Sequence, residues 1–345
     1  MRKPVILTGL RANNNLTIGN YFGAMLPIIE MAKQRAGEYQ INMFIPDLHS
    51  FTTPIDHAQL QAQILHNARL FAAAGLPLTN DSILLYRQSY VPAHSELTWI
   101  LDCFTGMGEM GRMIEYKEKS KKVGDDRVSV GLFNYPVLMA SDILLYGASY
   151  VPVGDDQRQH IEFTRDIAER MNSQFGDVFT VPFAPEKQAE FFGKGQALRI
   201  MDLVNPTKKM SKSDDSGKGV IFLTDEPEAA AKKIMSATTD DRANINYNPI
   251  EQPGVSNLLL ILAMLRGLPL DDIEAEFKGM SSYGEFKRVV ADEVSRFLLD
   301  FRARLADIDD TVILSALKES EETANEQAKS TLLKVQRAVG LRPVR

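Results

Sequence analysis

The stretch VILTGLRANNNLTIGN, residues 5–20, decides the fold of this chain. It begins with an apolar run of strand length and continues through Gly9 and three asparagines into a helix that we expect to begin between Thr17 and Asn20. A strand that ends in a glycine turn and leads into a helix N-terminus presents free backbone N–H groups to an anion, so this stretch predicts a phosphate site. A purely structural role stays open, because Gly and Asn also occur in such turns only to satisfy positive φ and capping.

The same alternation of short apolar runs and amphipathic runs continues outward from this stretch. INMFIPDL (41–48) and SILLYRQ (82–88) are further candidate strands. The segment 57–75 between them has the apolar period of a helix, with Asp56 as a possible N-cap and Gly75 placed to end it. Pro27 conflicts with the helix that follows the first turn and should interrupt it.

A fourth candidate strand, SYVPVG (149–154), precedes a helical segment over 155–172. The helical period of this segment turns Ile161, Ile167 and Ala168 inward. Repeated strand–helix–strand units predict an α/β protein with a Rossmann-like, doubly wound parallel sheet.

After residue 222 the pattern changes to helices alone. We expect helices at 226–238, 256–266, 270–278, 284–307 and 321–339. Pro227 suits a first helical turn, and Ser256 and Gly267 flank the second helix of this set. The chain therefore divides into a Rossmann-like domain over 1–222 and an all-helical C-terminal domain over 223–345, with FLTDEP as the hinge.

Composition limits the functions that this chain can perform. It has 345 residues, 44% hydrophobic and 24% charged, which is ordinary for a soluble globular protein of two domains. The net charge of −6 gives no general attraction for nucleic acid, so a polyanion must be met locally. Cys103 is the single cysteine, which we expect in the core of a cytoplasmic protein. We predict no membrane segment, because no stretch has the required apolar length.

Local positive charge is gathered in NPTKKMSKSDDSGKG, residues 205–219. Its pentapeptide KMSKS (209–213) and the earlier TIGN (17–20) resemble the two signature motifs of class I aminoacyl-tRNA synthetases. Cleavage of ATP at the α-phosphate moves negative charge onto the departing pyrophosphate. The ammonium groups of Lys209 and Lys212 can move with the pyrophosphate and stabilise this charge. Their stabilisation would act mainly in the transition state.

The resemblance extends over nearly the whole chain to the tryptophanyl-tRNA synthetase family. It is carried by GEMGRMIEYKEKS (108–120), YPVLMASDILLY (135–146), VPVGDDQRQHIEFTRDIAERMN (151–172) and GVSNLL (254–259). The resemblance implies that Lys209, Lys212, Lys119, Thr17 and Asn20 are catalytic. It implies that ATP is bound by Gly9, Arg11, Thr17, Gly19, Asn20, Gly154, Asp156, Gln157, Lys209, Met210, Ser211, Lys212 and Ser213. It implies that tryptophan is bound by Asp142, Tyr135, Met139, Val151, Val153, Gln157, His49 and Leu7, and it assigns no metal ligand.

Asp142 matches the residue that accepts a hydrogen bond from the indole N–H in this family. Indole has one donor and no acceptor, so a fixed carboxylate is a natural partner. A phenylalanine side chain would leave this acceptor unpaired, whereas a tyrosine hydroxyl could also donate to it. Structural roles stay open for these positions: Asp142 could be a capping or salt-bridged residue, and Tyr135 and Met139 could be ordinary core.

Two departures from the family pattern concern the substrate sites. The first loop usually reads Gln-Pro-Ser-Gly, whereas this chain has RANN at 11–14. Arg11 could serve the α-phosphate as a fixed cation, where glutamine would be a neutral donor. Leu7 stands where an aromatic residue often lies under the substrate ring.

The implied reaction has two steps, which use ATP with Mg²⁺, L-tryptophan and tRNA(Trp). Tryptophan attacks the α-phosphate to give tryptophanyl-adenylate and pyrophosphate, and the adenylate then acylates the 3′-terminal ribose of tRNA. The family works as a homodimer, so residues 95–150 are expected to form the subunit contact, with Trp99, Ile100 and Phe104 as candidate anchors. The helical domain is expected to bind the anticodon stem. The alternatives are a tyrosyl-tRNA synthetase, a non-catalytic tryptophan-sensing or RNA-binding paralogue, and a small-molecule adenylyltransferase.

Overall fold

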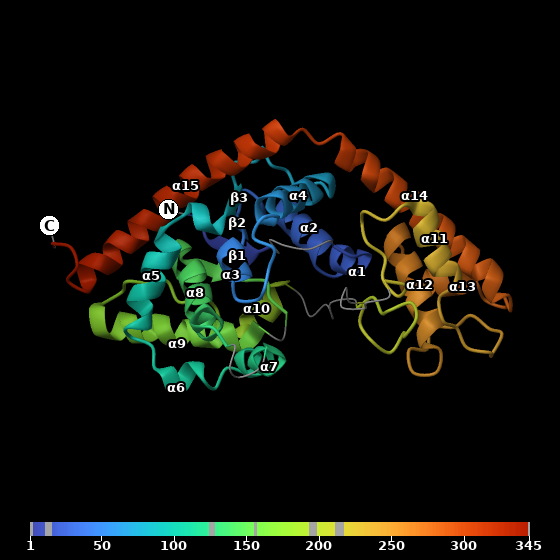
Figure 1. Cartoon of the computed structure of the whole chain (residues 1–345), viewed down its shortest axis with the longest axis horizontal. Coiled ribbons are helices and arrows are strands. Elements are labelled where there is room, and N and C mark those ends of the chain that lie inside the picture. The colour runs from blue at the N-terminus through green and yellow to red at the C-terminus, as the bar shows by residue number, and fades with distance from the viewer. Residues whose placement is uncertain are drawn as a thin grey trace.

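A four-stranded parallel sheet forms the centre of the first half of the chain. The computed structural model describes residues 3–10, 16–123, 128–154, 157–192, 199–210 and 217–343, without the side chains of 122 and 123. The strands are β1 (Val5–Gly9), β2 (Gln40–Ile45), β3 (Ile83–Arg87) and β4 (Ala148–Tyr150), in the order β3-β2-β1-β4. All three neighbouring pairs are parallel. The predicted parallel α/β fold is confirmed (Figure 1).

Alternate side chains of each strand enter two different hydrophobic cores. Ile6 of β1 packs in a core with residues of helices α2 (Leu26–Arg35) and α4 (Leu60–Ala73). Its neighbours Val5 and Leu7 pack in a second core with α5 (Ala93–Asp102), α8 (Val130–Tyr146) and α9 (Arg158–Phe175). Because successive strand residues point to opposite faces, helices must cover both faces of this sheet. The inward positions predicted on α9 are confirmed, since Ile161, Ile167 and Ala168 are buried.

The helical run after the first turn is interrupted where Pro27 predicts. It consists of α1 (Ile18–Asn20), a π-helical turn η1 (Tyr21–Met25) and α2, in whose first turn Pro27 lies. A widened turn before proline accommodates the ring and the missing N–H. Tyr21 and Phe22 of η1 pack against Phe297 of α14 (Tyr283–Ala306), with centroids 5.2 and 5.7 Å apart, so this turn joins the two halves of the chain.

Short helices connect the larger elements of the first half. They are α3 (Asp47–Ser50), the 3-10 turn η2 (Gln88–Tyr90), α6 (Met107–Met110), α7 (Ile114–Val123) and α10 (Pro185–Phe192). The second half contains α11 (Pro227–Met235), α12 (Pro253–Arg266), α13 (Leu270–Glu276), α14 and α15 (Asp310–Ala338). Its described part is helical, as predicted, and Pro227 lies in the first turn of α11.

Three predicted details of helix boundaries are wrong. Helix α4 begins at Leu60 with Gln59 as N-cap, because the Asp56 carboxylate instead accepts from Ala58 N in the preceding turn. Helix α12 begins at Pro253, so Ser256 lies inside it, where its hydroxyl accepts from Asn248 N at 2.8 Å. The last helix begins at Asp310 rather than at 321, with Asp309 as its N-cap.

Two predictions about individual side chains on and after α5 are also corrected. Cys103 is exposed rather than buried, since it follows the last turn of α5 on the outer side. Ile100 is only 5% exposed and belongs to the core of its own chain, so it is no anchor for a second subunit. Trp99, the residue before it on α5, is 71% exposed. Phe104 is half-buried, with its ring against Phe175.

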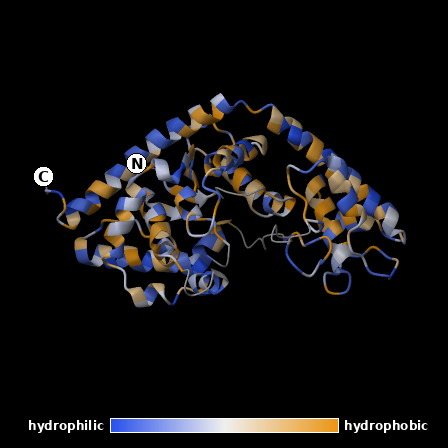
Figure 2. Ribbon diagram, viewed as in Figure 1, coloured by the Kyte–Doolittle hydropathy of each residue, from blue (hydrophilic) through white to orange (hydrophobic). Residues whose placement is uncertain are grey.

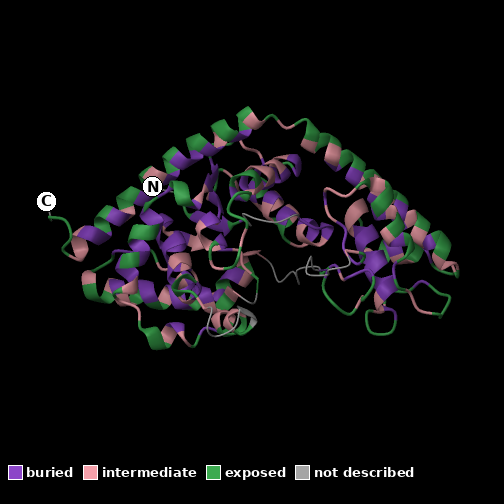
Figure 3. Ribbon diagram, viewed as in Figure 1, coloured by how far each residue is buried: buried purple, intermediate pink, exposed green. Residues whose placement is uncertain are grey.

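The last helix, α15, returns from the helical half to the sheet. Figure 1 shows α14 and α15 as an arch over the two halves of the molecule. The inner face of α15 is apolar and buried and its outer face is polar and exposed (Figures 2 and 3). Leu85 N of edge strand β3 donates to Ser320 Oγ at 3.2 Å, and Arg87 N donates to Glu321 Oε1 at 3.3 Å. Side chains of α15 thus satisfy backbone donors that β3 leaves unpaired at the sheet edge.

Candidate active site

A cavity of about 360 Å³ opens at the carboxyl ends of β1 and β2. Parallel α/β sheets bind ligands at this edge, because the strand-to-helix turns place polar groups there. The structure brings together all eight residues that the sequence assigns to the tryptophan pocket, and the lining also includes Gly9 and Lys119. The eight are Leu7, His49, Tyr135, Met139, Asp142, Val151, Val153 and Gln157.

Gly9 leaves room for the ring of Phe44 where β1 meets this cavity. A Cβ at this position would lie 3.2 Å from Cζ of Phe44, which also lines the cavity. A side chain at this position would therefore press against the Phe44 ring, which would have to move by a few tenths of an ångström. The residue acts through close approach, because its φ lies outside the left-handed region.

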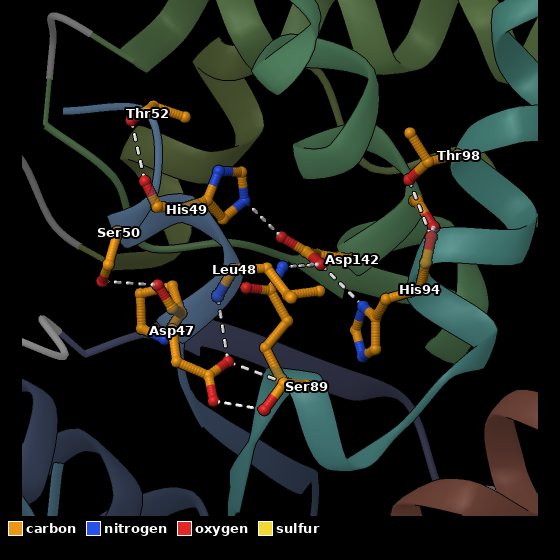
Figure 4. Close-up of polar contacts among 12 residues, drawn as sticks. Asp47, Leu48, His49, Ser50, Thr52, Ser89, His94, Thr98 and Asp142 are labelled. Carbon is orange, nitrogen blue, oxygen red and sulfur yellow. Dashed lines mark hydrogen bonds and ion pairs between the residues drawn. The ribbon is translucent and has the colours of Figure 1, made fainter. Parts of the chain in front are cut away.

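Asp142 is the polar centre of the cavity wall (Figure 4). It lies on α8, is fully buried, and its carboxylate accepts three hydrogen bonds: from His49 Nε2 at 2.9 Å, from His94 Nδ1 at 2.6 Å and from Gln88 Nε2 at 2.7 Å. Burial raises the pKa of this carboxyl, but the hydrogen bonds and charges of the two histidines outweigh burial and hold the pKa below its ordinary value. The group is therefore an anion at neutral pH. A carboxylate has about four acceptor positions, so about one remains for a ligand.

Gln88 and His94 were missed by the sequence-based prediction. Gln88 lies in η2, directly after β3, and His94 lies in the first turn of α5; both are fully buried. The Nε2 atom of His94 lies 2.9 Å from the hydroxyl of Tyr146, which continues the buried polar chain. The available signal was position: Gln88 is the last residue of the predicted strand 82–88, at the carboxyl end where parallel sheets place site residues.

Asp47 connects the two short helical segments that carry His49 and Gln88, α3 and η2. Its carboxylate accepts from Leu48 N at 3.0 Å and from Ser89 N at 2.8 Å, and also from the hydroxyl of Ser89 (Figure 4). The Asp47 carboxylate accepts hydrogen bonds from groups that follow β2 and from groups that follow β3. It therefore fixes the relative positions of His49 and Gln88, which donate to Asp142.

Lys119 and Tyr135 form the second polar part of the cavity wall. The ammonium of Lys119, on α7, lies 4.2 Å from the ring centroid of Tyr135 and 3.7 Å from the Glu115 carboxylate. The hydroxyl of Tyr135 lies 3.0 Å from His160 Nε2. The aromatic face attracts the ammonium and so holds a positive charge at the cavity wall, where it can meet an anionic ligand.

The described part of the second predicted signature motif, Lys209 and Met210, lies near the first motif outside this cavity. Thr17 caps α1, accepting from Asn20 N at 3.1 Å while the Asn20 side chain accepts from Thr17 N. A Cβ on Gly19 would lie 3.8 Å from Cβ of Met210, which is buried. The start of the first helical run is thus in contact with a residue from far along the chain.

Lys209 lies on a hairpin that leads to this contact. Residues 200–202 run antiparallel to 208–210, with Asp202 N donating to Lys208 O at 2.8 Å and Met210 N donating to Ile200 O at 3.0 Å. The side chain of Lys209 is exposed. None of Thr17, Gly19, Asn20, Lys209 and Met210 lines the cavity.

The remaining predicted ATP contacts divide into two groups. Gly154 is exposed, and its carbonyl accepts from Gln157 N at 2.9 Å, in the turn that begins α9. Arg11, Asp156, Ser211, Lys212 and Ser213 lie outside the described residues.

Neither a metal cluster nor a single membrane-spanning helix is found in the described ranges of the chain. Among those residues, no group of three or more His, Cys, Asp or Glu side chains is placed to hold a metal ion. In the same part of the chain no single helix is long and apolar enough to cross a membrane; α12 and α13 reach that length and hydropathy only when joined across a bend of 112°.

Comparisons with known proteins give a consistent result. The family described as tRNA synthetases class I (W and Y) matches residues 1–299. The chain is 41% identical over 336 residues to the tryptophan–tRNA ligase of Caldanaerobacter subterraneus subsp. tengcongensis, covering 97% of this chain and 98% of that protein.

Solved structures of similar fold agree with the sequence match. Tryptophanyl-tRNA synthetase from Mycoplasma pneumoniae superimposes with a TM-score of 0.83 at 32% identity, over 99% of both chains. The enzyme from Campylobacter jejuni, solved in complex with ADP and tryptophan, gives a TM-score of 0.80 at 29% identity, over 97% of this chain and 99% of that one.

Proposed function

The chain belongs to the class I tRNA synthetases of the tryptophan and tyrosine group, and we propose how its residues carry out the reaction. It is a tryptophan–tRNA ligase. It activates L-tryptophan with ATP to tryptophanyl-adenylate and pyrophosphate, and it then transfers tryptophan to the 3′-terminal ribose of tRNA. The predicted family and activity are thereby confirmed.

The indole occupies the cavity at the ends of β1 and β2 in this proposal. Its N–H donates to the acceptor position that His49, His94 and Gln88 leave on Asp142. Leu7, Met139 and Val153 supply apolar contact with the ring. The observation that carries the proposal is a buried anion, already held by three donors, in the wall of a mainly apolar cavity. Such an anion selects a side chain with one donor, because a side chain without a donor would leave it under-paired.

ATP lies between this cavity and the contact of the two signature motifs. The tryptophan carboxylate is already nucleophilic, so the residues act by alignment and by stabilising charge rather than by acid or base chemistry. Lys119 lies at the cavity, where it meets the α-phosphate or the departing pyrophosphate. Lys209 reaches the same phosphates from its hairpin, and Lys212 is assigned the same role on the resemblance alone. Mg²⁺ enters with ATP as part of the substrate.

The assembly and the second half of the chain complete the proposal. The exposed apolar side chains Trp99, Met107 and Val130, which are 71%, 76% and 82% exposed, suit a contact with a second copy of the chain. The helical half, residues 223–345, binds the anticodon stem of tRNA(Trp), and the protein acts in the cytoplasm.

An aminoacylation assay tests the proposed function against the alternative functions. Purified protein is incubated with ATP, Mg²⁺, tRNA(Trp) or tRNA(Tyr), and radiolabelled tryptophan or tyrosine. We expect acid-precipitable label only with tryptophan and tRNA(Trp). Label from tyrosine on tRNA(Tyr) would make the protein a tyrosine enzyme, and tryptophan binding without transfer would make it a non-catalytic paralogue.

A further inference from the structure

Asn257 connects the helical half of the molecule to the hairpin that carries Lys209. It lies on α12 and is 4% exposed. Its side-chain Oδ1 accepts from Met201 N at 2.8 Å, and its Nδ2 donates to Met201 O at 2.9 Å. One amide side chain thus bonds both backbone polar groups of a single residue.

These two groups of Met201 lie on the outer edge of the hairpin. The bonds between the two hairpin strands use Ile200 O and Asp202 N, so Met201 N and O point the other way. A two-stranded hairpin is marginal by itself, and a third partner on its edge stabilises its position. Asparagine is suited to this role, because it offers a donor and an acceptor on a short side chain.

Further contacts fasten the same hairpin to the helical half. Thr238 N donates to Leu203 O at 2.8 Å, and Thr238 Oγ1 donates to Val204 O at 2.7 Å. A Cβ on Gly254, in the first turn of α12, would lie 2.0 Å from Thr238 O. The start of α12, residue 238 and the hairpin therefore pack as one unit, in which no side chain fits at Gly254.

The other end of the hairpin meets the first signature motif. Met210 is buried against Gly19, and Lys209 precedes it in the chain. Met201 forms a bridge with Lys209 across the strand pair, so a shift of Met201 would act on the position of Lys209 and Met210. Misplacement of a charge-stabilising group by about 1 Å can lower a rate by about 100-fold.

We propose that Asn257 is a positioning residue for adenylate formation: it fixes Met201, and through the strand pair it sets the place of Lys209 beside Thr17–Asn20. This inference rests on the proposed role of Lys209. It assigns to GVSNLL (254–259) a function in the first reaction step, although that segment lies in the helical half and outside the cavity.

The test compares Asn257→Ala with a control variant that loses two equivalent side-chain-to-backbone hydrogen bonds at another site. Asn172 on α9 forms the same pair with Phe179, donating to its O at 2.9 Å and accepting from its N at 2.8 Å. It lies about four helical turns from Gln157 at the cavity. Tryptophan-dependent ATP–pyrophosphate exchange gives kcat and KM for ATP, calorimetry gives Kd for tryptophan, and thermal unfolding gives the structural cost.

We expect Asn257→Ala to lower kcat at least about tenfold, with Kd for tryptophan within about twofold of the wild type. Asn172→Ala should show a similar loss of thermal stability and wild-type kcat. Equal kcat in the two variants would overturn the inference, whereas wild-type protein without exchange activity would overturn the proposed function instead.

Two more variants keep the test valid where Asn257→Ala does not fold. Asn257→Asp has the same shape and retains the bond from Met201 N, but it sets a carboxylate oxygen against Met201 O. Asn257→Gln retains a donor and an acceptor on a longer side chain. We expect Asp to lower kcat as Ala does and Gln to recover part of it; wild-type kcat in the Asp variant would contradict the positioning role.

Discussion

Asp142 shows how a single residue acquires its chemistry from its neighbours. The sequence predicted the carboxylate and the cavity residues around it through the family blocks. It did not predict that His94 and Gln88 donate hydrogen bonds to Asp142. These bonds depend on how close the segment after β3 lies to α8, which the sequence does not show. The hydrogen bonds and charges of His49 and His94 hold the pKa of Asp142 below its ordinary value, so it stays ionised although it is fully buried. An acceptor of this kind is fixed before the ligand arrives.

Replacing Asp142 with Asn should raise KM for tryptophan by roughly 10-fold to 100-fold, because a neutral amide is a weaker acceptor and its NH₂ group meets donors. The value of kcat at saturating tryptophan should change less. The control is Ser141→Ala, one residue earlier on α8, whose hydroxyl bonds His94 O and does not line the cavity. An unchanged KM in the Asn variant would place the indole elsewhere.

The same variant gives a pH dependence with a definite sign. The folded-state pKa of Asp142 lies below the ordinary value of 3.8, so its ionised form stabilises the folded protein above that value. This contribution is lost as pH falls through the folded-state pKa. The difference in unfolding free energy between wild type and Asp142→Asn should therefore be largest at neutral pH and shrink in acid. A difference that stays constant in denaturant titrations across this range would refute the assignment.

Lys119 is the described lysine that lines the cavity. Lys119→Met keeps most of the side-chain length and removes the charge, so we expect kcat for exchange to fall roughly 100-fold, with little change in Kd for tryptophan. Lys117→Met, on the same helix but outside the cavity lining, is the control. Equal exchange rates in the two variants would show that Lys119 does not stabilise the phosphates.

At the scale of elements, strands were easier to predict than helix starts. Three of the four strands are short apolar runs, which are visible in the sequence. The fourth was predicted at 149–154, which is wrong, because β4 covers Ala148–Tyr150 and the chain leaves the sheet at Val151. The start of α12 depends on Gln252 and on the contact of Gly254 with Thr238, both set by tertiary structure. The length of α15 likewise follows from packing, because this helix is held by β3 and α4 as well as by its own helical period.

The contact of α15 with the edge of β3 is a testable element. Arg87 and Glu321 form a pair with 12% and 8% side-chain exposure, and Nη2 lies 2.8 Å from Oε2. Glu321→Ala leaves the guanidinium buried and without its carboxylate, so the unfolding free energy should fall by about 3–5 kcal/mol. Glu30→Ala removes the exposed pair with Lys33 and should cost less than about 1 kcal/mol. Equal losses in chemical denaturation would contradict this account.

In the molecule as a whole, both hydrophobic cores contain residues from the sheet and from the helical half. The core on the α2 face of the sheet continues through Met210 and Val220 into the helical half. The sequence predicted two domains from the change of pattern near residue 222, and that boundary remains a prediction. The return of α15 to the sheet was not predictable, because its amphipathic period does not say which surface it covers.

The proposed dimer is tested at Trp99. If this side chain lies in a subunit contact, Trp99→Glu should convert the protein to a monomer in sedimentation at micromolar concentration, since a buried charge without a partner opposes association. Leu299→Glu, at an apolar side chain on α14 that is 62% exposed, should leave the dimer intact. A wild-type protein that sediments as a monomer would remove the dimer from the proposal.

A fixed carboxylate binds the indole of tryptophan in this proposal, while lysines stabilise the departing pyrophosphate. Amino-acid-dependent exchange of labelled pyrophosphate into ATP, without tRNA, measures this step alone. We expect rapid labelling of ATP with tryptophan and at least about 100-fold less with phenylalanine, which cannot donate to Asp142. We expect less labelling with tyrosine as well, because the chain is a tryptophan–tRNA ligase, although the tyrosine hydroxyl could donate to the carboxylate. Labelling that is equal with tyrosine, or absent with tryptophan, would contradict the proposal.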